Sequence, residues 1–229
     1  MIKSFLGVSL IDFPGVVSSI VFIGGCNFRC PFCHNPELVL PERLASIPSL
    51  SPEEVLKKIE RRKNFIKGVE FTGGEPLLFP GLMEMVKEVK KMGLMVKIDT
   101  NGSLPDKLSS FLGVADYVAM DLKSSFERYS EAAGVDVDLE RIKESIELIK
   151  KFPDYEFRTT VVPGLAGKEE IVEVVEYIKG AKRYVLQGFR GIKTLDEKYE
   201  KIPPPSRAYM EEVKKAIEGK VGEVLIRNV

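Results

Sequence analysis

The chain has 229 residues, a length that suits one large domain or two small ones. Its 34 basic side chains balance its 34 acidic ones, and this zero formal net charge argues against a nucleic-acid-binding protein. No stretch approaches the length of about 18 uncharged apolar residues that a membrane helix needs, and the N-terminus lacks the apolar core of a signal peptide. We therefore expect a cytoplasmic protein without a membrane-spanning segment.

Short β-branched runs alternate with amphipathic stretches along the first half of the chain. The Val- and Ile-rich run at 17–23 predicts a strand that ends at two glycines. Ser51 as N-cap, Pro52 at the first helical position and Glu54 completing a capping box predict the start of a helix. The further elements that we expect in this half are a strand at 69–71, a helix at 80–92 and a strand at 95–99.

The same alternation continues through the second half. The elements that we expect there are helices at 104–112, 139–151 and 169–179, strands at 117–122, 156–162 and 183–186, and, after three prolines, a helix at 206–218 and a strand at 223–227. Such alternation predicts an α/β fold of parallel strands joined by right-handed crossovers. About six strand–helix units fall short of the eight of a closed TIM barrel, and periodicity alone leaves a doubly wound open sheet as an alternative. With no evident linker, we expect a single domain over 1–229, comprising a core at about 16–200 and a C-terminal helix and strand at 203–229.

All three cysteines of the chain lie in one short stretch with C-x3-C-x2-C spacing, at Cys26, Cys30 and Cys33. An odd number of thiols fits poorly with a disulfide framework. An iron–sulfur cubane takes four thiolates, so a loop that supplies three leaves one iron open for chemistry. The alternative is a closed zinc site that adds His34, although adjacent Cys33 and His34 are awkward joint ligands of one ion.

The cysteine loop resembles the cluster-binding signature of the radical S-adenosylmethionine (radical SAM) superfamily in its spacing, its flanking glycines and its place after an apolar strand. The Cys33-His34-Asn35 ending and the lead-in at 11–15 are similar to the enzymes that activate glycyl-radical proteins. This resemblance implies an incomplete (β/α)6 TIM-like barrel. It also implies one 4Fe-4S cluster held by Cys26, Cys30 and Cys33, with S-adenosylmethionine (SAM) bound at the open iron.

Polar motifs follow two of the predicted strands, where parallel α/β folds collect their working residues. Gly73, Gly74 and Glu75 follow the second strand; alone they would suit a common turn, and by resemblance they bind the methionine amino group of SAM. Asp99, Thr100 and Asn101 follow the third strand; alone they would suit an Asx turn. By resemblance they contribute to the SAM site, where Asp99 and Thr100 lie beside a bound monovalent cation.

Charged residues mark the next two strands. Asp121 and Lys123 are two positions apart and therefore point to the same face, which suits either an internal ion pair or a ligand site. Arg158 could hold a carboxylate through two hydrogen bonds, or it could be a surface arginine at a strand end. The resemblance places Asp121, Lys123 and Arg158 around SAM.

The segment after the sixth predicted strand indicates which glycyl-radical protein the chain would activate. Phe189 stands where activases of pyruvate formate-lyase carry a histidine, and His34 is the only histidine of the chain. The resemblance is therefore closest to the activating protein of anaerobic ribonucleotide reductase, with a flavodoxin- or ferredoxin-type reductant. The alternatives are an activase of pyruvate formate-lyase, a small-molecule radical SAM enzyme such as a 7-carboxy-7-deazaguanine synthase, and a zinc-binding module without enzymatic activity.

Overall fold

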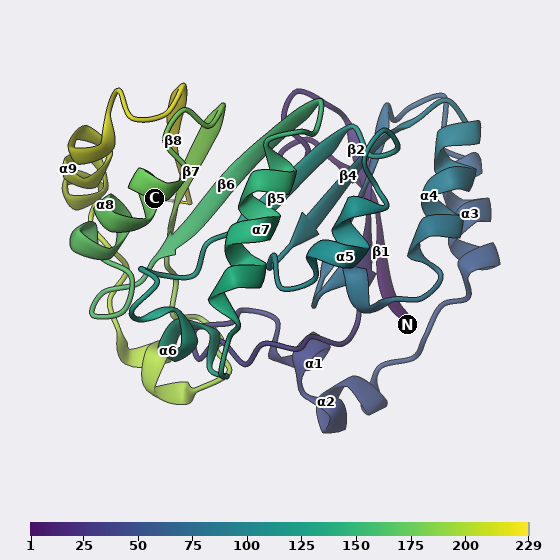
Figure 1. The fold of residues 1–229 in the computed structure, drawn as a ribbon. Helices are drawn as coiled ribbons and strands as arrows, with labels where there is room; N and C mark the ends of the chain where they lie inside the picture. The colour runs from purple at the N-terminus through teal and green to yellow at the C-terminus, as the bar shows by residue number, and fades with distance from the viewer. Residues whose placement is uncertain (229) are drawn as a thin grey trace.

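Eight strands form one continuous sheet in chain order in the computed structural model, which describes residues 1–228 (Figure 1). The first strand runs antiparallel to the second, and all later neighbours are parallel. The strands are β1 (Ile2–Ser9), β2 (Ser18–Ile23), β3 (Gly68–Gly73), β4 (Met95–Thr100), β5 (Tyr117–Asp121), β6 (Asp154–Val161), β7 (Arg183–Gly188) and β8 (Glu223–Arg227).

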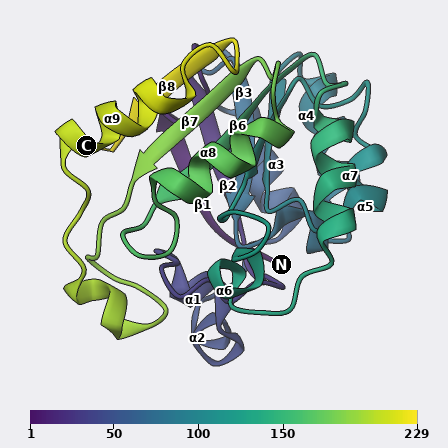
Figure 2. The same cartoon turned by 60° about the vertical axis from the view of Figure 1, so that its left-hand side comes forward.

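Helices in the crossovers cover the outer face of the curved sheet (Figures 1 and 2). These helices are α3 (Pro52–Glu60), α4 (Leu82–Lys91), α5 (Pro105–Ser109), α7 (Leu139–Ile149), α8 (Lys168–Tyr177) and α9 (Arg207–Ile217). Shorter helices follow strand ends; they are α1 (Pro36–Val39), α2 (Pro41–Ser46), α6 (Tyr129–Ala133) and the 3-10 turns η1 (Pro76–Leu78) and η2 (Glu197–Lys201). In Figure 1, α1, α2 and α6 lie below the sheet, at the end toward which the parallel strands point.

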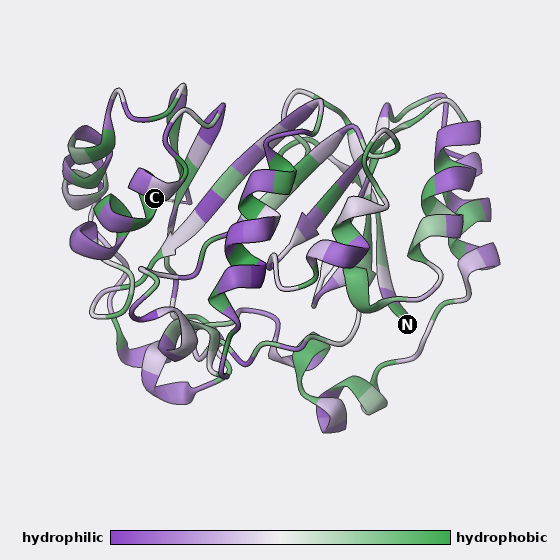
Figure 3. Ribbon diagram, viewed as in Figure 1, coloured by the Kyte–Doolittle hydropathy of each residue, from purple (hydrophilic) through white to green (hydrophobic). Residues whose placement is uncertain are grey.

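One apolar side of each long helix packs against the sheet. On α4, Leu82, Met85, Val86 and Val89 are buried while Lys87 and Lys91 are exposed, and Figure 3 shows a similar alternation along the other outer helices. The burial of these side chains supplies the main stabilising free energy of the fold. The predicted helix starts are confirmed, because Ser51 and Glu54 form a capping box and the Ser206 hydroxyl accepts from the Tyr209 amide.

The predicted fold class is confirmed as an incomplete, TIM-like α/β barrel. Six parallel strands from β2 to β7 are each followed by helical structure, and the predicted last strand extends the sheet as β8. The structure adds β1, which the sequence analysis missed and which pairs with β2 at the other edge. Among residues 1–228 no pairing joins β1 to β8, so the barrel stays open on one side. No helix in that range has both the length and the apolar character needed to cross a bilayer.

Candidate active site

The C-terminal ends of the parallel strands surround a cavity of about 610 Å³. Every residue predicted for the site lines this cavity except Glu75; the lining includes Cys26, Cys30, Cys33, Gly73, Gly74, Asp99, Thr100, Asn101, Asp121, Lys123 and Arg158. Segments that are far apart in sequence therefore meet at one end of the sheet, as parallel α/β topology predicts.

The lining of the cavity has an apolar part and a charged part. Apolar side chains from β2 and the cysteine loop include Ile20, Phe22, Phe28 and Phe32. The strands β3 to β6 and the residues just after them contribute most of the charged groups, and we call this part the charged side. A ligand with an apolar part and a charged part, such as a sulfonium nucleotide with an amino-acid tail, fits this division.

Backbone contacts fix the shape of the cysteine loop after β2. The Cys33 amide donates to the Cys30 carbonyl at 3.0 Å, and the Arg29 guanidinium donates to the Cys26 and Phe28 carbonyls at 2.7 Å each. The Arg29 amide donates to the carbonyl of Ala133 at the end of α6, which anchors the loop to the β5–α7 connection. The shape of the loop is therefore supported by its own backbone contacts and by the contact with Ala133.

Burial keeps the three thiols protonated in the metal-free chain. It raises the pKa of Cys26 to about 11, that of Cys30 to about 12, and that of Cys33 above its usual range. The Lys123 ammonium acts in the opposite direction on all three thiols. Metal binding at these sulfurs must therefore release protons, as it does at other thiolate sites.

The chemistry of the donor set fits a cluster. A cubane assigns each thiolate to a different iron, and Cys26, Cys30 and Cys33 line one cavity. A closed zinc site needs a fourth ligand, and His34, which follows Cys33 directly in the chain, is an awkward joint ligand with it.

The glycines after β3 allow a close approach of two loops. A Cβ on Gly74 would lie 2.1 Å from the Gly25 carbonyl oxygen, so only glycine fits there. The Glu75 amide donates to that same carbonyl at 2.8 Å. The strand-end loop of β3 is thereby pressed against the cysteine loop, which places Gly73 and Gly74 in the cavity wall beside the thiols.

Glu75 itself lies behind the cavity wall. Its carboxylate accepts from the Leu77 amide at 3.1 Å, the Thr100 hydroxyl at 3.0 Å and the Asn101 amide at 2.7 Å. Burial raises the pKa of Glu75 to about 7, and these hydrogen bonds oppose the shift. The carboxylate is therefore committed to joining two loops, and only the neighbouring glycines reach the cavity.

Asn101 combines a turn role with a contact to the cysteine loop. Its side-chain oxygen accepts from the Ser103 amide at 2.9 Å, which confirms the Asx turn that the sequence left as an alternative. Its amide nitrogen donates to Asn27 at 2.9 Å and lies 3.9 Å from the Cys26 sulfur. The loop after β4 thus contacts the loop that carries the thiols.

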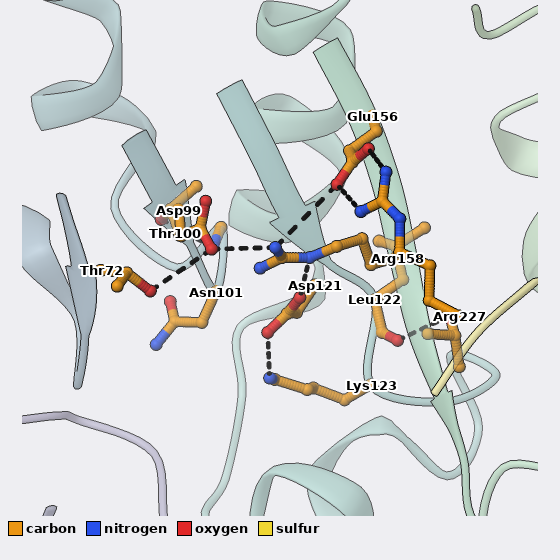
Figure 4. Close-up of polar contacts among 12 residues, drawn as sticks. Thr72, Asp99, Thr100, Asn101, Asp121, Leu122, Lys123, Glu156, Arg158 and Arg227 are labelled. Atoms are coloured by element: carbon orange, nitrogen blue, oxygen red, sulfur yellow. Dashed lines mark hydrogen bonds and ion pairs between the residues drawn. The ribbon is translucent and has the colours of Figure 1, made fainter. Parts of the chain in front are cut away.

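A chain of ion pairs runs across the charged side of the cavity (Figure 4). Arg158 donates to Asp99 and to Asp121 at 2.8 Å each, and Asp121 accepts from Lys123 at 3.0 Å. Only 11% of the Arg158 side chain is exposed, so the alternative of a surface arginine is wrong. The predicted pairing of Asp121 with Lys123 is confirmed as an internal contact.

Four further charged residues of the interior were not predicted. Lys97 on β4 pairs with Asp99 at 2.6 Å and with Glu70 on β3 at 2.8 Å. On the far side of Arg158, the Glu156 carboxylate accepts two hydrogen bonds from Arg227 on β8, at 2.8 and 2.9 Å. The two-residue spacing of Lys97 from Asp99, and of Glu156 from Arg158, is the sequence signal that could have found two of the four.

Known proteins with similar sequences point to the same kind of site. The family model described as the Radical SAM superfamily matches residues 20–178. A protein of Methanocaldococcus jannaschii, named as a proposed glycyl-radical enzyme activating enzyme, is 31% identical over 237 residues that span 100% of this chain and 96% of the relative. The pyruvate formate-lyase-activating enzyme of Clostridium pasteurianum is 37% identical over 127 residues, which are 53% of this chain and 52% of that enzyme.

A solved structure shares the fold over the whole chain. The crystal structure of QueE from Escherichia coli superimposes with a TM-score of 0.60 at 18% sequence identity, covering 100% of this chain and 93% of QueE. The family match covers more than half of the sequence and includes the cysteine loop together with the ends of β3 to β6. The chain therefore belongs to the radical SAM superfamily, whose members use a 4Fe-4S cluster and SAM.

Proposed function

We propose that this protein activates a glycyl-radical enzyme. One combination carries the proposal: three thiols share a cavity with charged strand ends, and the full-length relative from Methanocaldococcus jannaschii is named as a proposed activating enzyme of this kind. Cys26, Cys30 and Cys33 hold the cluster in this proposal. When bound together, cluster and SAM supply a one-electron cleavage that yields methionine and a 5′-deoxyadenosyl radical.

Residues of the cavity wall orient SAM in this proposal. Gly73 and Gly74 present backbone beside the thiols, where the amino group of methionine binds. The Lys123 ammonium, which faces the cavity from the end of β5, attracts the carboxylate. Asp99 and Asn101 bind the ribose side of the nucleotide. Phe28 and Phe32 exclude water from the reacting carbon, since the chain's part in such chemistry is to orient the cofactors and keep the site dry.

The open side of the barrel gives a partner access to the cavity. Ile11 and Asp12 line the cavity near β1, and Arg227 and Asn228 line the cavity at the end of β8. Because these two edges do not pair, a peptide loop that carries a glycine can enter between them. We propose that this glycine belongs to anaerobic ribonucleotide reductase, and that a flavodoxin- or ferredoxin-type protein reduces the cluster.

The choice of ribonucleotide reductase depends on the segment after β7. Phe189 is fully buried there and stacks on His34 of the cysteine loop, with ring centroids 5.8 Å apart. A buried phenyl ring in that position fills space beside the cluster loop and offers no proton or hydrogen bond. The pyruvate formate-lyase activases carry a histidine near the position of Phe189, so we propose ribonucleotide reductase as the partner.

The test is an activation assay in oxygen-free solution. The reconstituted protein, SAM and a reductant are incubated with purified anaerobic ribonucleotide reductase or with pyruvate formate-lyase, and each mixture is examined by electron paramagnetic resonance (EPR). A glycyl doublet on the reductase supports the proposal, and a doublet on the lyase alone moves the assignment to the other activase. SAM cleavage without either doublet, together with formation of a 7-deazaguanine product, would overturn it in favour of the small-molecule alternative.

A further inference from the structure

Arg158 bridges two carboxylates from neighbouring strands. Its Nη1 donates to the Asp99 Oδ2 atom at 2.8 Å, and its Nε donates to the Asp121 Oδ1 atom at 2.8 Å. The two acceptors come from the ends of β4 and β5, while the guanidinium reaches them from β6, as Figure 4 shows. One planar cation therefore holds two acidic strand ends together.

The outer oxygens of the two carboxylates also have cationic partners. Lys97 donates to the Asp99 Oδ1 atom at 2.6 Å, and Lys123 donates to the Asp121 Oδ2 atom at 3.0 Å. Glu70 also accepts from Lys97, at 2.8 Å. Both acidic side chains at the strand ends therefore already have two side-chain cations as partners.

This arrangement does not fit the monovalent cation that the family resemblance places at Asp99 and Thr100. A hard cation needs several free oxygen ligands, whereas each oxygen of Asp99 and Asp121 already accepts from nitrogen. The Thr100 hydroxyl donates to Glu75 at 3.0 Å and accepts from the Gly102 amide at 3.1 Å. An ion placed here would have to compete with Lys97, Arg158 and Lys123 for the same carboxylate oxygens.

Further contacts hold Arg158 in its bridging position. Its Nη1 lies 4.0 Å from Glu156, and Arg227 engages both oxygens of that carboxylate. The Asp99 Oδ2 atom also accepts from the Thr72 hydroxyl at 3.3 Å. The bridge is therefore embedded in contacts from β3, β6 and β8, and the cavity wall is ordered by side chains alone.

We propose that Arg158 takes the place of an inorganic cation in this protein, so that SAM binds without any dependence on monovalent ions. In this role Arg158 is a positioning residue, because it acts on the nucleotide site through Asp99 and Asp121. The part of the proposal that concerns SAM rests on the proposed function; the part that concerns the ion is a property of the metal-free chain.

Two measurements test the proposal in sodium, potassium and choline chloride at equal ionic strength. The first is the thermal unfolding midpoint of the metal-free protein. The second is the dissociation constant of SAM on the reconstituted protein, measured by calorimetry. We expect both values to be the same in the three salts. Loss of about fivefold or more in SAM affinity on replacing sodium and potassium by choline, the size of an ordinary coupling between sites, would overturn the proposal.

Removing the Arg158 guanidinium should make the unfolding midpoint depend on which monovalent ion is present. Arg158→Gln removes the cationic partner of one oxygen on each of Asp99 and Asp121, so potassium or sodium should raise its unfolding midpoint relative to choline. Arg183→Gln is the matched control: it removes an arginine that contacts Glu223 and Tyr117 outside the cavity, and it should gain no ion dependence. An Arg158→Gln variant whose midpoint is equal in all three salts would contradict the replacement.

The two measurements also separate this proposal from the proposed function. A wild-type protein that binds no SAM in any salt would remove the proposed function, while the unfolding midpoints would still decide whether the site takes an ion. If Arg158→Gln fails to fold, the wild-type comparison alone decides, because any stabilisation of the metal-free protein by sodium or potassium over choline contradicts an ion-free site.

Discussion

The Glu75 carboxylate and the Asn101 backbone amide lie 2.7 Å apart and join the loops that follow β3 and β4. Both residues were predicted to contact SAM. The structure gives Glu75 a different place, since it is fully buried and accepts three hydrogen bonds within the protein. Its contribution to the site is to hold Thr100 and Asn101, which themselves line the cavity.

Replacing Glu75 by Ala should therefore destabilise the fold. The change leaves the Leu77 and Asn101 amides without acceptors in a buried site, and each orphaned donor costs about 1–3 kcal/mol. Urea unfolding of the metal-free protein should show this loss, whereas Glu60→Ala, which breaks an exposed pair with Lys63, should change the free energy of unfolding by less than about 0.5 kcal/mol. Equal stability of the two variants would mean that the Glu75 contacts are not formed.

Replacing Cys30 by Ala should abolish cluster assembly and SAM cleavage while leaving the barrel folded. The thiol lies in a loop held by backbone contacts, so its loss removes a ligand without breaking a strand. Iron and sulfide analysis after reconstitution measures the first effect, and circular dichroism checks the fold. Asn64→Ala, which changes an exposed residue outside the cavity, is the control and should retain iron. Full SAM cleavage by Cys30→Ala would refute its assignment as a ligand.

Asp99→Ala should weaken SAM binding by about 10–100-fold, the range found when residues that support a bound cofactor are removed. The substitution releases Lys97 and Arg158 from their shared carboxylate, so the charged wall loses its order. Calorimetry on the reconstituted variant gives the dissociation constant. Asp106→Ala, which breaks an exposed pair with Arg141, should bind SAM as the wild type does. An unchanged constant for Asp99→Ala would remove this residue from the site.

Gly134→Ala should impair iron incorporation. Gly134 has a φ of 67°, and a Cβ there would lie 2.0 Å from the Arg29 carbonyl oxygen in the cysteine loop. Gly113 has a φ of 74° with open space around it, so Gly113→Ala reports backbone strain alone, about 1–2 kcal/mol. We expect a larger loss of stability for Gly134→Ala, and reduced iron per chain only for that variant. Equal iron content in both would show that the contact does not shape the loop.

The metal-free protein should lose stability as the pH rises from about 5 to 7. Burial, together with the nearby Asp99 charge, raises the pKa of Glu70 above its usual range. Between the unfolded pKa of about 4.3 and the higher folded value, the folded state binds more protons than the unfolded state, so each pH unit costs at most about 1.4 kcal/mol per proton. Glu70→Gln should flatten the slope measured by urea unfolding.

Other groups in this pH range do not obscure the Glu70 comparison. Glu75 shifts stability in the same direction, because its pKa is also raised, to about 7. His34 acts in the opposite direction, because burial lowers its pKa and stability from that group rises with pH. Glu75 and His34 are present in both the wild type and Glu70→Gln, so their contributions cancel when the two pH slopes of stability are subtracted. An identical slope in the two proteins would show that Glu70 is ionised in the folded state.

Much of the parallel sheet could be predicted from the sequence. Buried parallel strands form continuous apolar runs, and helix starts such as Ser51 and Ser206 carry capping signals that depend on a few adjacent residues. The strand β1 was missed because Ile2–Ser9 mixes polar and apolar residues, and its pairing with β2 is decided by tertiary contact. Helix α6 has five residues, too few to show a helical period.

The strand-end motifs located the cavity, yet they did not reveal which side chains would face a ligand. Gly73 and Gly74 line the cavity, while the buried partners of Glu75 depend on how two loops meet and leave no mark in the local sequence. Arg227 is a similar case, because its contact with Glu156 exists only once β8 lies beside β7. Spacing along one strand identifies a shared face; contacts between strands need the assembled sheet.

The central claim is that three cysteines hold a cluster with one iron left for SAM. EPR of the reduced, reconstituted protein before and after SAM addition tests this claim most directly. We expect a 4Fe-4S signal that changes when SAM is added and that is lost in Cys30→Ala. A cluster signal that SAM leaves unchanged, or a protein that binds zinc and assembles no cluster, would contradict it.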